Sequence, residues 1–142
     1  LERPLARKRA VALNWESSVD AAFVYGDPNA LYQVITNLIR NAVDASQQRK
    51  TAVLVTLERI GKTLAVTVRD RGVGIAPEQL ARIFDAGFTT KPPGTGSGTG
   101  LAVVREITEH VFGGTVQVES EVGAGSTFTL ALPIPSQRAG ES

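Results

Sequence analysis

The chain has 142 residues, and its 15 lysines and arginines against 14 aspartates and glutamates leave a formal net charge of +1. With 42% hydrophobic and 20% charged residues, it can bury the core of a compact domain and has no charge excess that would favour nucleic acid. The absence of cysteine and the single histidine exclude disulfides, thiolate zinc sites, cysteine nucleophiles and metal sites that need paired histidines.

Neither a membrane span nor a signal peptide is expected. No apolar run approaches the roughly 20 residues that a span requires, and the starting sequence Leu-Glu-Arg-Pro is not that of a signal peptide. We therefore expect this chain to make no direct membrane contact.

Turn-forming residues and changes in the spacing of apolar residues divide the chain into helices and strands. In chain order, the pattern predicts strands at 11–15 and 22–25, a helix at 28–48, a hairpin of strands at 52–58 and 63–68, a short helix at 77–83, a loop at 85–99, a helix at 100–111, and strands at 115–121 and 126–132. Asp27 is the expected N-cap of the long helix and Pro28 its first residue. These elements predict a two-layer α/β sandwich of the α+β class, in which about three helices cover one face of a mixed, mainly antiparallel sheet of about five strands.

The polar side of the long helix is rich in amides. Gln33, Asn37, Asn41 and Asp44 follow one another at helical spacing and so share one face. Because asparagine is a poorer helix former than lysine or glutamate, this face points to a functional role, although a solvated polar face fits the pattern equally well. An asparagine oxygen is a neutral, hard donor of the kind that Mg²⁺ accepts, which makes Asn41 a candidate metal ligand.

Residues 70–74, Asp-Arg-Gly-Val-Gly, follow directly after a predicted strand. The two glycines allow the backbone to approach a flat ligand closely. A carboxylate at this position can accept a hydrogen bond from an exocyclic amine, as acidic residues do at a base edge, so Asp70 is a candidate adenine-binding residue. The alternative, which this motif alone favours, is a turn in which Asp70 bonds only nearby backbone amides.

Residues 94–101, Gly-Thr-Gly-Ser-Gly-Thr-Gly-Leu, combine a glycine-rich loop with the start of a predicted helix. Backbone N–H groups at a helix N-terminus suit an anionic group, and the loop hydroxyls add donors, so we interpret this segment as a phosphate cradle. It is neither a Walker loop nor a dinucleotide-binding fingerprint, because no Gly-Lys-Ser/Thr follows and no strand immediately precedes it. A flexible linker is the alternative.

In this order and at these separations, the three features resemble the ATP-binding catalytic domain of bacterial sensor histidine kinases, in the superfamily shared with gyrase, Hsp90 and MutL. The resemblance covers about residues 10–133 and implies the Bergerat fold. The segments that carry it look like the N box (33–42), the first glycine box (70–74), the F box with its Phe-Thr-Thr-Lys ending (84–91), the second glycine box (96–101) and the closing Gly-x-Gly-Ser/Thr-x-Phe strand (123–128). The Phe-Thr-Thr-Lys form is similar to the nitrogen-regulator and dicarboxylate-sensor branch, whereas Ala86 and Gly87 stand where the family often has Pro and Phe.

The resemblance implies that the chain uses ATP and Mg²⁺ and forms ADP. Asn41 would hold Mg²⁺, Asn37 and Lys91 would complete the catalytic set near the phosphates, Asp70 would bind the adenine amine, and residues 84–99 would form a lid. The residues that the resemblance assigns to nucleotide binding are Asn37, Asn41, Asp44, Asp70, Gly72, Gly74, Ile75, Phe84, Thr89, Thr90, Lys91, Gly96, Ser97, Gly98, Thr99, Gly100, Leu101 and Thr127. The implied division of the chain is a linker remnant at 1–9, the catalytic domain at 10–134 and a disordered tail at 135–142.

Position 37 distinguishes kinases from ATPases within this superfamily. The gyrase-like and MutL-like members resemble each other in having a glutamate four residues before the metal-binding asparagine, where it can polarise an attacking water. Here that residue is Asn37, whose amide cannot accept a proton, so the site is expected to hold ATP and pass its γ-phosphoryl group to a histidine elsewhere. His110 is followed by Val111 rather than an acidic residue, and we interpret it as a structural residue near the end of its helix.

The implied partners are a histidine-containing dimerisation domain of the same parent kinase and a downstream response regulator, in the cytoplasm. Whether the parent kinase is anchored in the inner membrane stays open. Two other hypotheses remain. One is an ATP-driven conformational clamp or ATPase, which Asn37 disfavours; the other is a degenerate docking module, against which Asn41, Asp70 and the box glycines argue.

Overall fold

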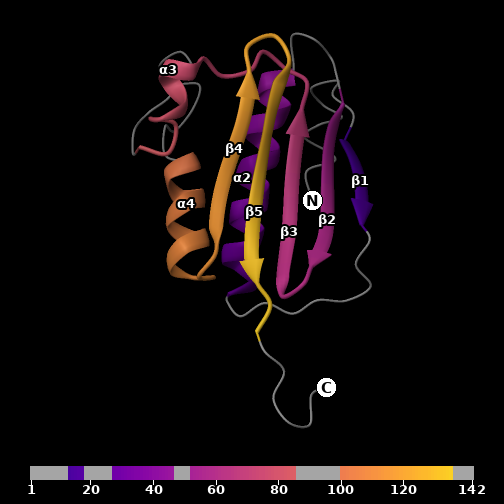
Figure 1. Ribbon diagram of the computed structural model, residues 1–142, viewed down its shortest axis with the longest axis vertical. Helices are drawn as coiled ribbons and strands as arrows, with labels where there is room; N and C mark the ends of the chain where they lie inside the picture. Colours follow the sequence, from indigo (N-terminus) through magenta and orange to yellow (C-terminus); the bar gives the residue numbers. More distant parts are fainter. Residues whose placement is uncertain (1–12, 18–26, 47–51, 86–99, 136–142) are drawn as a thin grey trace.

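The computed structural model describes residues 13–17, 27–46, 52–85 and 100–135, which form a sheet packed on helices. In chain order the elements are β1 (Leu13–Ser17), α2 (Pro28–Ser46), β2 (Val53–Ile60), β3 (Thr63–Asp70), α3 (Pro77–Leu80), α4 (Gly100–His110), β4 (Thr115–Glu121) and β5 (Gly125–Pro133) (Figure 1). The long helix α2 runs along the middle of the sheet, and α4 lies beside it.

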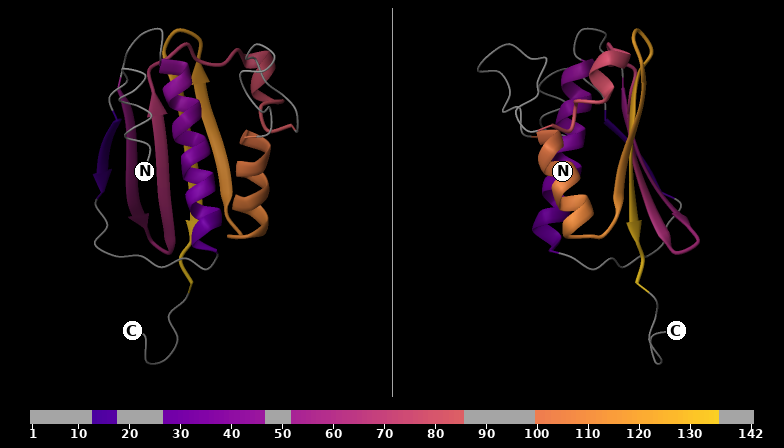
Figure 2. Two further views of the ribbon diagram at one scale, coloured as in Figure 1. Left: turned by 180° about the vertical axis from the view of Figure 1, so that it is seen from behind. Right: turned by 60° about the vertical axis from the view of Figure 1, so that its left-hand side comes forward.

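The five strands are ordered β1-β2-β3-β5-β4 in one sheet. β1 and β2 are parallel, whereas the β2–β3, β3–β5 and β4–β5 pairs are antiparallel. The two views in Figure 2 show that the helices lie on one face of the sheet, and no described element covers the other face. The predicted two-layer sandwich, with a mixed and mainly antiparallel sheet under helices on one side, is therefore confirmed.

The hydrophobic core lies between α2 and the central strands. Leu38 on α2 is fully buried, and so are the cross-strand partners Val68 and Phe128 and, next to them, Val66 and Leu130. Because successive side chains of a strand point to opposite faces, the residues between these positions face away from the helices. This alternation decides which side chains at the strand ends can take part in a site on the helix side.

The long helix begins where the sequence predicts. Asp27 Oδ1 accepts a hydrogen bond from the Asn29 backbone N–H at 2.9 Å, and the Asp27 carbonyl accepts one from the Leu31 N–H at 3.1 Å. Pro28 is the first helical residue, a position where no helical N–H bond is needed. The predicted end at residue 48 lies outside the described part of the chain.

Several other boundaries differ from the prediction because pairing and turns, rather than local sequence, determine them. The first strand lies at Leu13–Ser17 instead of 11–15, in parallel register with β2. β3 extends to Asp70 because Asp70 pairs with Ser126 of β5. The short helix ends at Leu80 instead of residue 83, since the Arg82 N–H bonds to the Gln79 carbonyl in a turn, and α4 ends at His110 instead of residue 111.

Some predicted features cannot be compared with the structure. They lie outside the described residues: the linker at 1–9, the strand at 22–25, most of the loop at 85–99 and most of the tail at 135–142. The predicted division of the chain into linker, domain and tail therefore stays a prediction.

Replacing Leu38 with alanine tests the packing of α2 on the sheet. Because Leu38 is fully buried, we expect Leu38→Ala to lower the free energy of unfolding by about 2–5 kcal/mol, the usual cost of a large-to-small change in a core. Tyr32 on the same helix is 49% exposed, and Tyr32→Ala should change this free energy by only about 0.5 kcal/mol. Urea titration followed by circular dichroism measures both values. Equal losses in the two variants would contradict the assigned buried face of α2.

Candidate functional site

The candidate site lies where the turn after β3 meets α2 and the β4–β5 hairpin. The Val73 N–H donates to the Ala45 carbonyl near the end of α2 at 3.3 Å. The Val73 carbonyl accepts a hydrogen bond from the Gly123 N–H of the hairpin at 2.9 Å. The predicted motif at 70–74 is thus attached to both layers of the fold.

Two glycines allow this close approach. A Cβ atom on Gly72 would lie 2.1 Å from the Ala45 carbonyl oxygen, and one on Gly74 would lie 2.2 Å from the Glu121 carbonyl oxygen. Gly74 also has a φ of +78°, in the left-handed region that other residues rarely adopt. The glycines that the sequence analysis assigned to a flat ligand therefore bring backbone segments of the protein itself into contact.

Asp70, the last residue of β3, is only 2% exposed. Its Oδ1 accepts hydrogen bonds from the Gly72 N–H at 2.9 Å and from the Ser126 N–H at 3.3 Å. Burial raises the pKa of this carboxyl above its usual 3.8, although the two backbone N–H donors act in the opposite direction. Both bonds end on Oδ1, so they orient the carboxylate without using Oδ2. The bond from Gly72 is the local turn bond that the alternative interpretation of this motif predicts. The bond from Ser126 comes in addition, from a strand that is distant in the sequence.

The amide face of α2 is partly buried, and one of its residues contacts α4. Asn37, Asn41 and Asp44 are half-buried, whereas Gln33 is exposed. Asn37 Nδ2 donates to the carbonyl of Gly100, the first residue of α4, at 3.4 Å. This bond joins the predicted N box to the end of the predicted second glycine box, although the two residues are 63 positions apart in the chain.

Ser126 belongs to this site and was missed by the sequence analysis, which named Thr127 instead. Ser126 is the cross-strand partner of Asp70, and both are buried on the helix side of the sheet. Thr127 pairs with Arg69 and points to the opposite face, because successive strand residues alternate. The structure therefore does not bring Thr127 to Asp70. The available signal was the Ser/Thr position of the Gly-x-Gly-Ser/Thr-x-Phe motif, which is Ser126 in this chain.

Three apolar residues of the predicted set, Ile75, Phe84 and Leu101, are partly buried and pack against the core. The Phe84 ring meets the Phe128 ring edge-on, with centroids 6.3 Å apart and planes at 86°. The first residue of the predicted lid is thus attached to β5. The other predicted lid and loop residues lie outside the described part of the chain: Thr89, Thr90, Lys91, Gly96, Ser97, Gly98 and Thr99. Their roles stay predictions.

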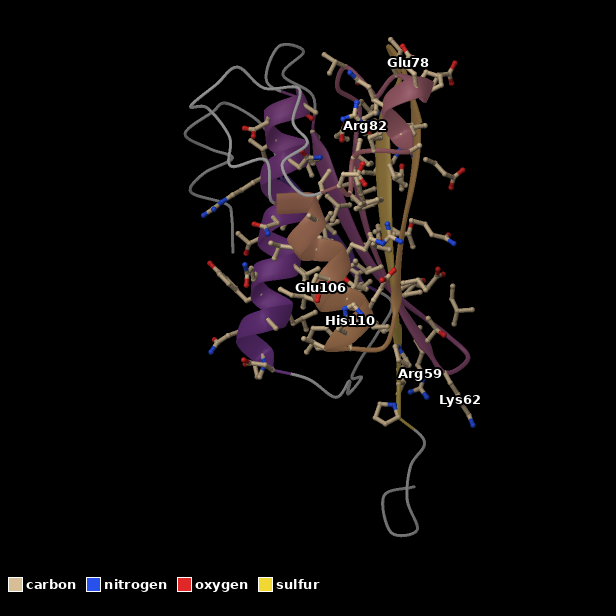
Figure 3. The ribbon with its side chains drawn as sticks, turned by 90° about the vertical axis from the view of Figure 1, so that its left-hand side faces the viewer. Arg59, Lys62, Glu78, Arg82, Glu106 and His110 are labelled. Atoms are coloured by element: carbon tan, nitrogen blue, oxygen red, sulfur yellow. The ribbon has the colours of Figure 1, made fainter. Side chains whose placement is uncertain are left out.

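His110 lies at the opposite end of α4 from Gly100, about 15 Å away along the helix. Its Nδ1 is 3.1 Å from Oε2 of Glu106, and the two side chains are 67% and 70% exposed. Figure 3 shows them close together on α4. An exposed pair of this kind contributes little to stability, and the role of His110 stays a prediction.

The described residues offer few metal ligands. No three or more histidine, aspartate or glutamate side chains among them are grouped so that they could hold a metal ion. Asn41 supplies one neutral oxygen from a half-buried position, and Mg²⁺ commonly takes one or two protein oxygens together with water and phosphate. The donor set therefore suits Mg²⁺ only in the presence of a phosphate-bearing ligand.

Comparison with known proteins identifies the class of this protein. Residues 26–136 match the family described as histidine kinase-, DNA gyrase B- and HSP90-like ATPases, and the chain belongs to this family. The predicted resemblance to the ATP-binding catalytic domain of sensor histidine kinases is confirmed. No helix in the described part of the chain is long and apolar enough to cross a membrane.

Individual relatives agree with this assignment. Sensor histidine kinase ZraS of Escherichia coli is 43% identical over 129 residues, which are 91% of this chain and 27% of that protein. Sensor-like histidine kinase SenX3 of Mycobacterium tuberculosis is 41% identical over 115 residues, which are 78% of this chain and 27% of its own length. The chain thus spans about a quarter, 27%, of the length of the curated relatives it matches.

Two solved structures share the fold. The catalytic domain of histidine kinase ThkA, in a nucleotide-free form, has a TM-score of 0.82 at 29% identity, covering 94% of this chain and 85% of that one. Full-length ShkA in complex with AMPPNP also has a TM-score of 0.82, at 31% identity, covering 96% of this chain and 28% of that one. The fold described above is therefore that of a histidine kinase catalytic domain.

The variant Asp70→Asn tests what burial of this carboxylate costs. Because burial raises the pKa of Asp70 above 3.8, the folded chain binds a proton more readily than the unfolded chain, and protonation stabilises the folded state. At mildly alkaline pH, where the carboxylate is charged in both states, Asp70→Asn should have the higher free energy of unfolding. As the pH falls through the raised pKa toward 3.8, the unaltered chain should recover this difference. Urea titrations of both proteins across this range measure it, and a difference independent of pH would contradict the explanation.

Proposed function

We propose that this domain binds ATP with Mg²⁺ and transfers the γ-phosphoryl group to a histidine on a separate dimerisation domain of its parent kinase. A response regulator then receives the phosphoryl group from that histidine. The observation that carries the proposal is the buried Asp70 carboxylate at the end of β3, which the N–H groups of Gly72 and Ser126 hold in place. Membership of an ATPase family supports it, and we place the domain in the cytoplasm, where ATP is available.

Asp70 is suited to recognising adenine. Its carboxylate oxygen accepts a hydrogen bond from an exocyclic amine, which adenine has at the position where guanine has an oxygen. Its burial strengthens such a bond, because little water competes for the same oxygen. The bonds from Gly72 and Ser126 to Oδ1 keep the carboxyl group oriented before a ligand arrives.

Asn37 and Asn41 are suited to the phosphate end of the nucleotide. Both belong to the half-buried amide face of α2, and Asn37 is bonded to Gly100 at the start of α4, where free backbone N–H groups favour an anion. Asn41 would provide a protein oxygen for Mg²⁺, which when bound neutralises charge on phosphate oxygens. Lys91, outside the described residues, would add a positive charge.

In this proposal the residues of the chain bind and orient ATP but do not react covalently. An imidazole nitrogen of the acceptor histidine attacks the γ-phosphorus, the bond between that phosphorus and the β–γ bridging oxygen breaks, and ADP leaves. Asn37 cannot accept a proton and so does not activate water, which favours transfer over hydrolysis. His110 is not proposed as the acceptor, since it lies exposed at the far end of α4.

Calorimetric titration of the chain with ADP and with GDP, each with and without Mg²⁺, tests nucleotide binding. We expect ADP to bind more tightly than GDP and Mg²⁺ to strengthen its binding, while ATP in a parallel sample stays largely unhydrolysed. Absence of ADP binding would contradict the proposal and favour a docking module. Rapid hydrolysis of ATP would favour an ATPase instead.

The variant Asp70→Asn tests the adenine assignment. It should weaken ADP binding by about 10- to 100-fold, because a hydrogen bond to a charged group is worth about 1.5–3 kcal/mol. Glu119→Gln is the matched control, since it removes a charge from β4 at a residue that pairs with Thr127 on the opposite face of the sheet. It should bind ADP like the unaltered chain. Unchanged ADP affinity in Asp70→Asn would exclude this role of the carboxylate.

The variant Asn41→Ala tests the magnesium assignment. It should remove most of the affinity that Mg²⁺ adds to ADP binding, while binding without Mg²⁺ stays within about threefold of the unaltered chain. Asn29→Ala is the control, because it removes an exposed amide about 18 Å away along the same helix. If Mg²⁺ strengthened ADP binding to Asn41→Ala as much as to the unaltered chain, Asn41 would not be the ligand.

A further inference from the structure

The hydroxyl of Ser120 connects three segments of the site that are separate in the sequence. Ser120, on β4, accepts a hydrogen bond from the Ile75 backbone N–H at 2.8 Å. Its Oγ also lies 2.9 Å from the Gly125 carbonyl oxygen and 2.8 Å from the Ser126 Oγ. Ser120 is the cross-strand partner of Ser126, which is in turn the cross-strand partner of Asp70, so the three side chains form one row on the helix side of the sheet.

Counting hydrogens determines the direction of every bond in this cluster. A serine hydroxyl has one hydrogen to donate and two lone pairs that accept. A carbonyl oxygen can only accept, so the 2.9 Å contact with Gly125 is a hydrogen bond only when the single Ser120 hydrogen is directed to that carbonyl. The contact between the two hydroxyls then requires Ser126 to be the donor and Ser120 the acceptor. The second lone pair of Ser120 receives the Ile75 N–H, so this hydroxyl is fully used.

The direction of these bonds decides what Ser126 can offer to a ligand. Its only hydroxyl hydrogen is directed to Ser120, so toward the site its oxygen presents lone pairs alone. Asp70, directly across the strand pair, is also an acceptor when ionised. The two neighbouring side chains therefore favour a ligand group that donates hydrogen bonds and disfavour one that only accepts them.

We propose that Ser120 is a positioning residue that determines base specificity. By accepting the hydrogen bond from Ser126, it makes Ser126 and Asp70 a pair of acceptors. This pair selects a purine nucleotide with an amino substituent over one with an oxo substituent. This role rests on the proposed nucleotide-binding function. The role of Ser120 goes beyond that function, because it places a determinant of base specificity on β4, in a residue that acts through Ser126. The bond from Ile75 to Ser120 also holds the turn that follows Asp70.

The test compares ADP with inosine diphosphate, which has an oxygen in place of the adenine amine. Ser120→Ala leaves the Ser126 hydroxyl without its acceptor, so the hydroxyl can turn and donate to that oxygen. We expect the preference for ADP over inosine diphosphate, measured as the ratio of their affinities by calorimetric titration, to fall by about three- to tenfold in Ser120→Ala. The titrations are made at a temperature well below the unfolding transition of each variant. Ser120→Thr keeps the hydroxyl and should keep the preference. Thr115→Ala is the matched control, because it removes an exposed hydroxyl from the same strand.

Two further measurements separate this role from a general effect on folding. If Ser120 acts through Ser126, adding Ser120→Ala to a Ser126→Ala chain should not change the preference any further. Hydrogen exchange of the Ile75 amide, followed by NMR without nucleotide, should be faster in Ser120→Ala than in Ser120→Thr. Should Ser120→Ala not fold, Ser120→Cys retains similar volume with a much weaker acceptor and should show the same loss of preference.

The possible results have different consequences. An unchanged preference in Ser120→Ala, or an equal loss of affinity for both nucleotides, would overturn the proposed role of Ser120 while leaving the proposed function intact. An unaltered chain that bound neither nucleotide would overturn the proposed function, and the role of Ser120 with it. A reduced preference in Ser120→Ala that Ser120→Thr restores would support the role.

Discussion

The contact between the Gly72 turn and the Ala45 carbonyl is the constraint on which the candidate site depends. Any side chain at position 72 would overlap that carbonyl oxygen, so only glycine lets the turn lie against α2. In this position the Gly72 N–H reaches Asp70 Oδ1, and the Val73 N–H reaches Ala45. The helix that carries the amides and the strand that carries the buried carboxylate are thereby kept at a fixed separation.

The sheet contributes the second part of the site through its register. Asp70, Ser126 and Ser120 are consecutive cross-strand partners on β3, β5 and β4, so their side chains lie in one row on the side of the helices. Burial raises the pKa of Asp70 and makes its carboxylate unfavourable for folding, but the same burial removes water that would compete with a ligand. A buried carboxylate that lowers the stability of the fold but strengthens ligand binding is typical of functional sites.

Features that depend on neighbouring residues were predicted well. The Asp27 cap and Pro28 locate the start of α2, and Gly61, with a φ of +61°, forms the turn expected between β2 and β3. Strand ends were predicted less well, because the pairing of a strand with a distant segment decides where it stops. Strand pairing also explains why Thr127 was predicted where the structure places Ser126 beside Asp70. A shift of one residue along a strand moves a side chain to the other face of the sheet.

The sequence by itself indicated the class of the protein and the order of its described elements, and it predicted that Asn37, Asn41 and Asp70 belong to one site. It could do so because helix caps, apolar spacing and short motifs are properties of adjacent residues. Only the tertiary structure showed that Gly72 fits against α2, that Ser126 rather than Thr127 accompanies Asp70, and that Ser120 orients the Ser126 hydroxyl. These features depend on contacts between residues that are far apart in the chain, such as the Ile75 N–H and Ser120 Oγ, 45 positions apart, and folding alone brings them together.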